Sequence, residues 1–166
     1  MSMIGEYLRV TPTQLDRARQ DPQWALELAE QIQDAQEEDQ PTPGQGRHYS
    51  TYQTWDLLGF LLRRAGFPVD IVHGEEPFAQ EDDWGYGPPT FLTAHRVQAA
   101  ADALTDMRYD DLIADVDYRE LVKAKVYPQG WDSPNSFEWA RDWFENLKTF
   151  FHTSASQGDA MLIWID

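Results

Sequence analysis

Residues 160–166 read AMLIWID, a nearly continuous apolar run in a chain of 166 residues. Such a run is typical of a central strand that is covered on both faces, because a half-exposed strand alternates apolar and polar side chains. A buried strand beside several amphipathic helices predicts a helix-rich α/β domain with a small sheet.

A second strand is predicted near the start of the chain, over Met3–Val10, where Ile4, Tyr7, Leu8 and Val10 precede a helix start at Thr11 and Pro12. The two terminal strands are therefore plausible neighbours in one sheet. Their pairing direction does not follow from the sequence.

The segments between these strands carry mostly helical signals. A short strand is predicted at Val69–Val72 and another ending at Phe91 and Leu92, and a flexible loop at about residues 37–49. The expected helices begin at Pro12, at Pro22 (to about Gln36), after a capping box of Ser50 and Gln53 (to Ala65), after Thr93, at Tyr109 (to Ala114), at Tyr118 (to Lys125), and after Ser133 (to Gly158).

Composition predicts one domain over residues 1–166. Hydrophobic residues make up 42% of the chain, which is enough for a core without further staples. Cysteine is absent, which excludes disulfides, thiolate zinc sites and cysteine nucleophiles.

The chain is strongly acidic, with a formal net charge of -16. Such a surface repels phosphate backbones and anionic lipids, so no nucleic acid and no membrane is expected as a partner, whereas a basic protein would be attracted. The N-terminal residues lack a basic region followed by an apolar one, which predicts a cytoplasmic protein.

The segment Glu81–Thr93 (EDDWGYGPPTFLT) combines two Gly, two Pro and three aromatic residues. Gly permits unusual backbone conformations, Pro fixes one dihedral, and aromatic rings supply area for burial. The segment is therefore expected to form a rigid, docked turn, in which Trp84 and Tyr86 could be either buried or exposed.

Several strings, in order, resemble one family. They are MSMIGEYLRVT, WDLLGFLL, WGYGPPTFLTAHRV, VYPQGW and GDAMLIWID, and together they look like the YfbM-like family of small bacterial proteins, a domain of unknown function. The resemblance implies a compact three-layer α/β domain and no established activity. Members often carry His where Gly59 stands and Arg where Thr90 stands, so this chain would lack any chemistry those residues performed.

The sequence contains few residue patterns that are typical of a catalytic or metal site. The four His residues show no metal-ligand spacing, no nucleophile motif occurs, and we expect no metal and no cofactor. His73 is close in sequence to Glu75, which could orient an imidazole for general base work. The structural alternative is a surface His at a turn.

Two functions are compatible with this sequence. The first is a non-enzymatic interaction module that offers an acidic, aromatic face to a basic protein, as immunity proteins do to toxins. The second is a small-molecule-binding protein or a hydrolase that uses His73 and Glu75. The candidate binding residues are Trp55, Glu75, Glu76, Asp82, Asp83, Trp84 and Tyr86.

Overall fold

The computed structural model describes residues 2–166, with five strands in a single antiparallel sheet of order β2-β1-β5-β4-β3. The strands are β1 (Gly5–Val10), β2 (His48–Tyr52), β3 (Glu76–Pro77), β4 (Thr90–Leu92) and β5 (Ala160–Ile165). The helices are α1 (Pro12–Gln20), α2 (Pro22–Asp39), α3 (Trp55–Arg64), α4 (Ala94–Thr105), α5 (Tyr109–Ile113), α6 (Tyr118–Lys123), the 3₁₀ helix η1 (Pro134–Ala140) and α7 (Arg141–Ser156).

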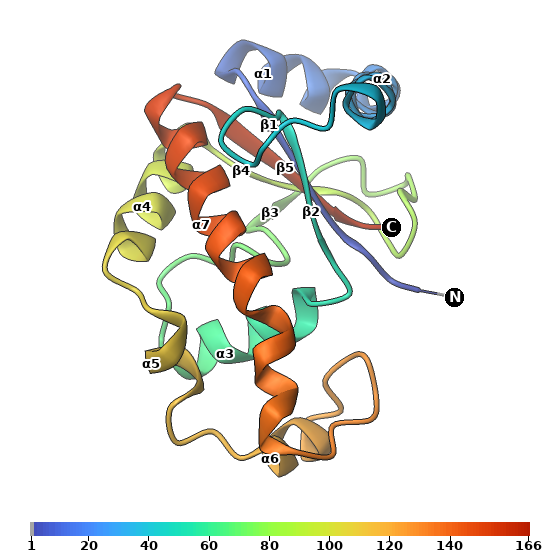
Figure 1. Ribbon diagram of the computed structural model, residues 1–166. Helices are drawn as coiled ribbons and strands as arrows, with labels where there is room; N and C mark the ends of the chain where they lie inside the picture. Colours follow the sequence, from blue (N-terminus) through green and yellow to red (C-terminus); the bar gives the residue numbers. More distant parts are fainter. Residues whose placement is uncertain (1) are drawn as a thin grey trace.

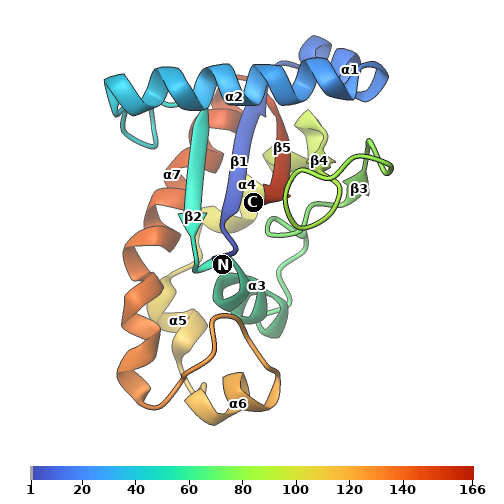
Figure 2. The ribbon, with the colours of Figure 1, turned by 90° about the vertical axis from the view of Figure 1, so that its right-hand side faces the viewer.

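The C-terminal strand β5 lies at the centre of the sheet and pairs with β1 along its whole length, from Gly5 opposite Ile165 to Val10 opposite Ala160. Both predicted terminal strands are thus confirmed, and they are neighbours. Their direction is antiparallel, which brings the two ends of the chain to the same end of the sheet (Figure 2).

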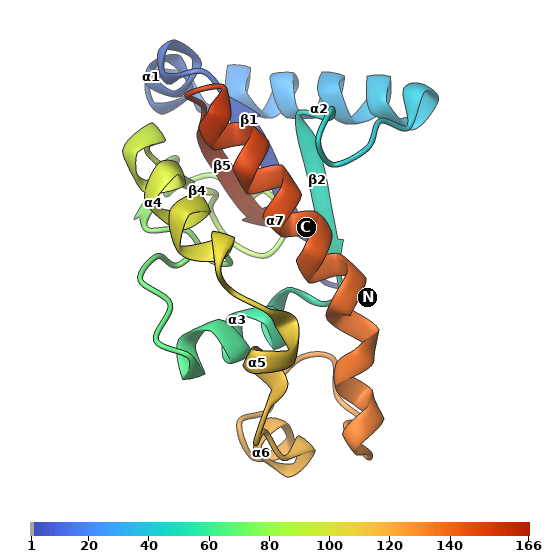
Figure 3. The same cartoon turned by 60° about the vertical axis from the view of Figure 1, so that its left-hand side comes forward.

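Helices cover both faces of the sheet in three layers. The helices α1 and α2 lie on one face, and α4 and α7 lie on the other, as Figures 1 and 3 show from two sides. Alternate residues of β5 divide between two hydrophobic clusters: Leu162 and Trp164 face α1 and α2, whereas Met161 and Ile163 face α4 and α7. The helices α3, α5 and α6 extend the cluster on the α4 and α7 side beyond the end of the sheet (Figure 1).

Two helix starts that the sequence predicted are formed by side-chain caps. The Thr11 hydroxyl accepts from the backbone N–H of Gln14, whose side chain accepts in turn from the Thr11 N–H. The Asp21 carboxylate accepts from the N–H of Trp24 at the start of α2. Each cap supplies an acceptor for a backbone N–H that the helix itself leaves unpaired.

Three local predictions are wrong. Residues 69–72 form no strand: the Asp70 side chain accepts from the backbone N–H groups of Val72 and His73 and folds the segment into a turn. Ser50 opens no helix, because it lies in β2 opposite Glu6, and α3 starts only at Trp55. The last helix begins as the 3₁₀ turn η1, and the Ser133 side chain makes no capping hydrogen bond.

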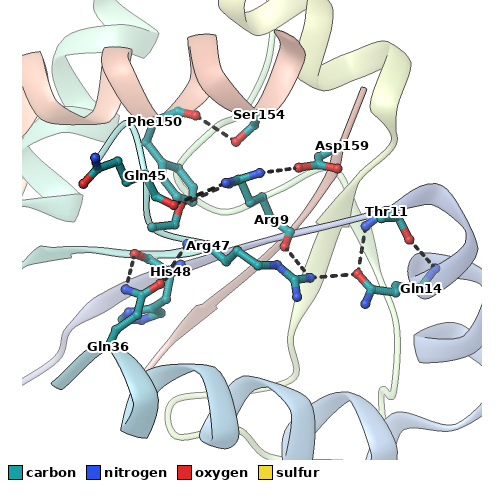
Figure 4. Close-up of polar contacts among 11 residues, drawn as sticks. Arg9, Thr11, Gln14, Gln36, Gln45, Arg47, His48, Phe150, Ser154 and Asp159 are labelled. Atoms are coloured by element: carbon teal, nitrogen blue, oxygen red, sulfur yellow. Dashed lines mark hydrogen bonds and ion pairs between the residues drawn. The ribbon is translucent and has the colours of Figure 1, made fainter. Parts of the chain in front are cut away.

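The segment predicted as a loop at residues 37–49 is shorter, because α2 continues to Asp39 and β2 begins at His48. Its second half is held to α2 by one side chain. The Gln36 amide oxygen accepts from the backbone N–H groups of Arg47 and His48, and its amide nitrogen donates to the His48 carbonyl (Figure 4). These three bonds fix α2 against the edge strand of the sheet.

Candidate functional site

The predicted site residues do not gather in one place. Trp55 lies in the hydrophobic cluster on the α7 side, stacks on Tyr127 and donates its indole N–H to the Met3 carbonyl. Trp84 lies in the cluster on the α2 side. The structure therefore places these two tryptophans in different cores and does not bring them together.

The two candidate acid–base residues each have another partner. Both carboxylate oxygens of Glu75 accept from the Arg96 guanidinium, at 2.7 and 2.8 Å. His73 lies with its Nδ1 3.6 Å from the Asp70 carboxylate, and its ring is perpendicular to that of Trp55, in a T-shaped contact. The Thr90 hydroxyl in β4 donates to the His73 carbonyl.

The segment around Trp84 is the docked turn that its composition predicted. The Asp83 carboxylate accepts from the N–H groups of Gly85 and Gly87, and the Tyr86 N–H donates to the Ile165 carbonyl at 2.9 Å. Asp82 and Tyr86 are exposed, as is Glu76 in β3. Trp84 itself is only 6% exposed, so this tryptophan belongs to the core.

A pocket of about 270 Å³ opens between α2, this turn and the end of β5. Asp83, Trp84 and Gly85 form one wall, which continues through Trp164 in β5 and Asp166 just after it. The opposite wall is α2, through Leu26, Ala29, Glu30 and Gln33. In Figure 2 the turn is the loop between β3 and β4 that lies beside the C-terminus.

The walls of this pocket combine two kinds of side chain. Trp84 and Trp164 meet edge to face, with ring centroids 5.2 Å apart. Glu30, Asp83 and Asp166 add three carboxylates, and the described residues that line the pocket include no Lys or Arg. An acidic, tryptophan-walled hollow is suited to a positively charged group, which carboxylates and aromatic faces both attract.

A buried contact between a histidine and a carboxylate lies behind the pocket wall. The His48 Nε2 is 2.5 Å from the Glu6 carboxylate, and both side chains are largely shielded from solvent. Burial raises the pKa of Glu6, the His48 contact opposes this, and the charge of Asp166 raises the pKa further. Two pocket residues touch this pair: Gln33 through its amide, 3.3 Å from His48 Nε2, and Trp164 through its ring.

Sequence reasoning missed Glu6, Glu30, Gln33, Trp164 and Asp166 as candidate site residues. Only Glu6 carried a usable signal, since it precedes Leu8 and Val10 at the two-residue spacing of a buried strand face. The others come together only when α2, the turn and β5 have packed.

A polar cluster lies at the end of the sheet opposite to the pocket. Arg9 in β1 pairs with Asp159 at 2.8 Å and donates to the Gly46 carbonyl, while Arg47 donates to the Arg9 carbonyl and to Gln14 (Figure 4). Among residues 2–166, no group of three or more His, Asp or Glu is arranged to hold a metal ion. None of the helices in that same range is long and apolar enough to cross a membrane.

The family model described as "Domain of unknown function (DUF1877)" matches residues 1–164. The chain belongs to this family. A solved structure, a protein of unknown function named YfbM from Escherichia coli, has the same fold, with a TM-score of 0.64 and 19% sequence identity. The alignment covers 98% of this chain and 99% of that one. A search of curated proteins finds no match.

The DUF1877 family and the YfbM fold confirm the resemblance that the sequence strings indicated, and with it the three-layer α/β architecture. Neither description names an activity. The function of this DUF1877 protein has to be argued from its own surface.

Proposed function

We propose that this DUF1877 protein is a non-enzymatic binding module that receives a basic protein on its acidic face. The acidic face comprises the exposed carboxylates of α2 and those of the turn opposite it. Its members are Glu27, Glu30, Asp34, Glu37, Glu38 and Asp39, together with Glu81, Asp82 and Asp83. The observation that carries the proposal is that α2 contains six of these carboxylates and no Lys or Arg.

Charge of one sign over one face acts on a partner at a distance. It attracts a basic protein before contact and raises the rate of association, and salt weakens the effect. The net charge of -16 adds to this field. The same field selects against acidic partners, because like charges brought together at an interface cost free energy.

We favour binding over catalysis with His73 and Glu75. A general base must lie within hydrogen-bond reach of the residue that orients it. Both oxygens of Glu75 are taken by Arg96, and the contact of His73 is with Asp70. Glu75 as an ion-paired residue is better suited to fixing β3 against α4 than to proton transfer.

Capture from native cell extract, followed by measurement on the purified captured protein, tests this proposal. We expect a basic partner that is retained at low salt and lost at high salt. Its association rate should fall about tenfold when Asp34→Asn, Glu37→Gln and Glu38→Gln are combined, with little change in dissociation, because these charges lie outside the pocket.

The matched control is the combination Asp106→Asn, Asp111→Asn and Asp115→Asn, which removes the same charge from exposed positions around α4 and α5. This control should leave the association rate within about twofold. Equal loss in both variants would show that net charge alone acts, and the acidic face would not be the site. An absence of any salt-sensitive partner would also contradict the proposal.

A further inference from the structure

The two tryptophans of the pocket have an unusual polar feature. Trp84 is 6% exposed and Trp164 5%, yet neither indole N–H has an acceptor among residues 2–166. By contrast, the indole N–H groups of the similarly buried Trp55 and Trp131 donate to the carbonyls of Met3 and Val126. An indole N–H that is cut off from solvent ordinarily finds such a partner, so these two groups need an acceptor from solvent or from a bound molecule.

The unpaired N–H groups are not sealed inside the core. Within residues 2–166, no side-chain nitrogen or oxygen is fully enclosed without a hydrogen-bond partner. Both indole nitrogens must therefore reach solvent, although more than nine-tenths of each residue is covered. Both residues line the pocket, so a molecule bound there would lie beside the two indole rings.

We infer that the pocket binds one arginine side chain of a peptide segment together with the carbonyl groups beside it. The guanidinium would lie among the carboxylates of Glu30, Asp83 and Asp166. The carbonyl oxygens of the peptide would accept from the indole N–H groups of Trp84 and Trp164. This inference rests on the proposed function, since the arginine belongs to the basic partner.

Size and chemistry favour arginine. At about 270 Å³ the pocket is slightly smaller than the roughly 300–1,000 Å³ typical of sites for whole small molecules, so it suits a single side chain. A planar guanidinium can contact several carboxylates at once, stacks on aromatic faces, and is more weakly hydrated than an ammonium. The chain makes such a contact itself, since the Arg17 guanidinium lies 4.2 Å from the centroid of the Trp24 ring.

Nitrogen-15 NMR of the tryptophan indole groups tests the inference directly. The probes are three capped tripeptides, Gly-Arg-Gly, Gly-Lys-Gly and Gly-citrulline-Gly, of which the last keeps the shape of arginine without its charge. Trp84→Phe and Trp164→Phe assign the two signals. We expect Gly-Arg-Gly to shift the indole signals of Trp84 and Trp164 but not that of Trp139, which is exposed elsewhere.

Carboxylate variants test whether the pocket carboxylates recognise the charge of the arginine peptide. Glu30→Gln and Asp83→Asn should each weaken Gly-Arg-Gly about tenfold, as loss of a charge-assisted contact does. Asp83→Asn keeps the oxygen that accepts from Gly85 and Gly87, so the turn should persist. Glu38→Gln, which removes a charge from α2 outside the pocket, should change binding by less than about twofold.

Three outcomes would overturn the inference: citrulline or lysine peptides that bind as tightly as arginine, equal effects of Glu30→Gln and Glu38→Gln, or unmoved indole signals at millimolar Gly-Arg-Gly. None of these outcomes contradicts the proposed function. That proposal is contradicted by a different result, namely that the captured partner associates at the same rate after the charges of Asp34, Glu37 and Glu38 are removed.

Discussion

At the scale of single residues, Gly85 fixes how closely the turn approaches β5. Its φ is 138°, and a Cβ atom there would lie 2.6 Å from the Ile165 carbonyl oxygen and 2.7 Å from the Asp166 Cα. Both contacts are with backbone, which cannot swing aside as a flexible side chain can. Only glycine therefore allows Trp84 to reach Trp164 and form the pocket wall.

We expect Gly85→Ala to lower the free energy of unfolding by about 1–3 kcal/mol, because the added methyl group forces the turn away from β5. Urea unfolding monitored by tryptophan fluorescence measures this change. Gly87→Ala is the control. Its φ of 106° is also unfavourable to alanine, but nothing lies within 4 Å of its Cβ position, so it reports backbone strain alone. Equal losses in the two variants would rule out the close contact as the cause.

At the scale of elements, helix starts that look alike in sequence differ in the structure. Thr11 before Pro12 and Ser133 before Pro134 have the same arrangement of cap and proline. Thr11 forms a full capping box at the start of α1, whereas Ser133 precedes the 3₁₀ helix η1 and makes no capping hydrogen bond. A cap stabilises a helix only where its oxygen meets an unpaired N–H.

Thr11→Ala should therefore cost about 1 kcal/mol of stability, since it leaves the N–H of Gln14 without its acceptor. Ser133→Ala should change the free energy of unfolding by less than about 0.5 kcal/mol, as substitutions away from such features do. Chemical denaturation of both variants under one set of conditions measures the difference. A larger loss in Ser133→Ala would contradict this account of the two caps.

Local signals also failed where tertiary contacts were stronger. Ser50 and Gln53 have the spacing of a capping box, but Ser50 lies in β2, where strand pairing satisfies the backbone. Val69, Ile71 and Val72 are buried as a strand would be, yet Asp70 turns the chain between them. Apolar residues in the sequence indicate that a segment is buried. Whether that segment pairs as a strand depends on a partner strand that is distant in the sequence.

At the scale of the whole molecule, the sheet is organised around β1 and β5, the strands nearest the two ends of the chain. Each of β1 and β5 has hydrogen-bonded neighbours on both sides, and β5 is covered by helices on both faces. At the other extreme, β3 is two exposed residues at the edge of the sheet. Local stability is expected to follow this order.

Amide hydrogen exchange should show the slowest rates at Tyr7, Leu8, Leu162 and Ile163, and faster exchange at Phe78, whose N–H donates to the Pro89 carbonyl beside β3. Exchange followed by NMR gives each amide separately. If Phe78 exchanged as slowly as β5, the edge of the sheet would unfold together with its centre, contrary to this expectation.

The sequence by itself determined the elements whose signals are local: the apolar run of β5, the caps of α1 and α2, and the turn held by glycine and proline around Trp84. It also determined the net charge, and through it the kind of partner proposed here. Only the tertiary structure decided that Glu30, Asp83 and Asp166 line one pocket with Trp84 and Trp164. The physical reason is that these residues come from three elements far apart in the chain, and the packing of α2 and the turn against β5 alone brings them together.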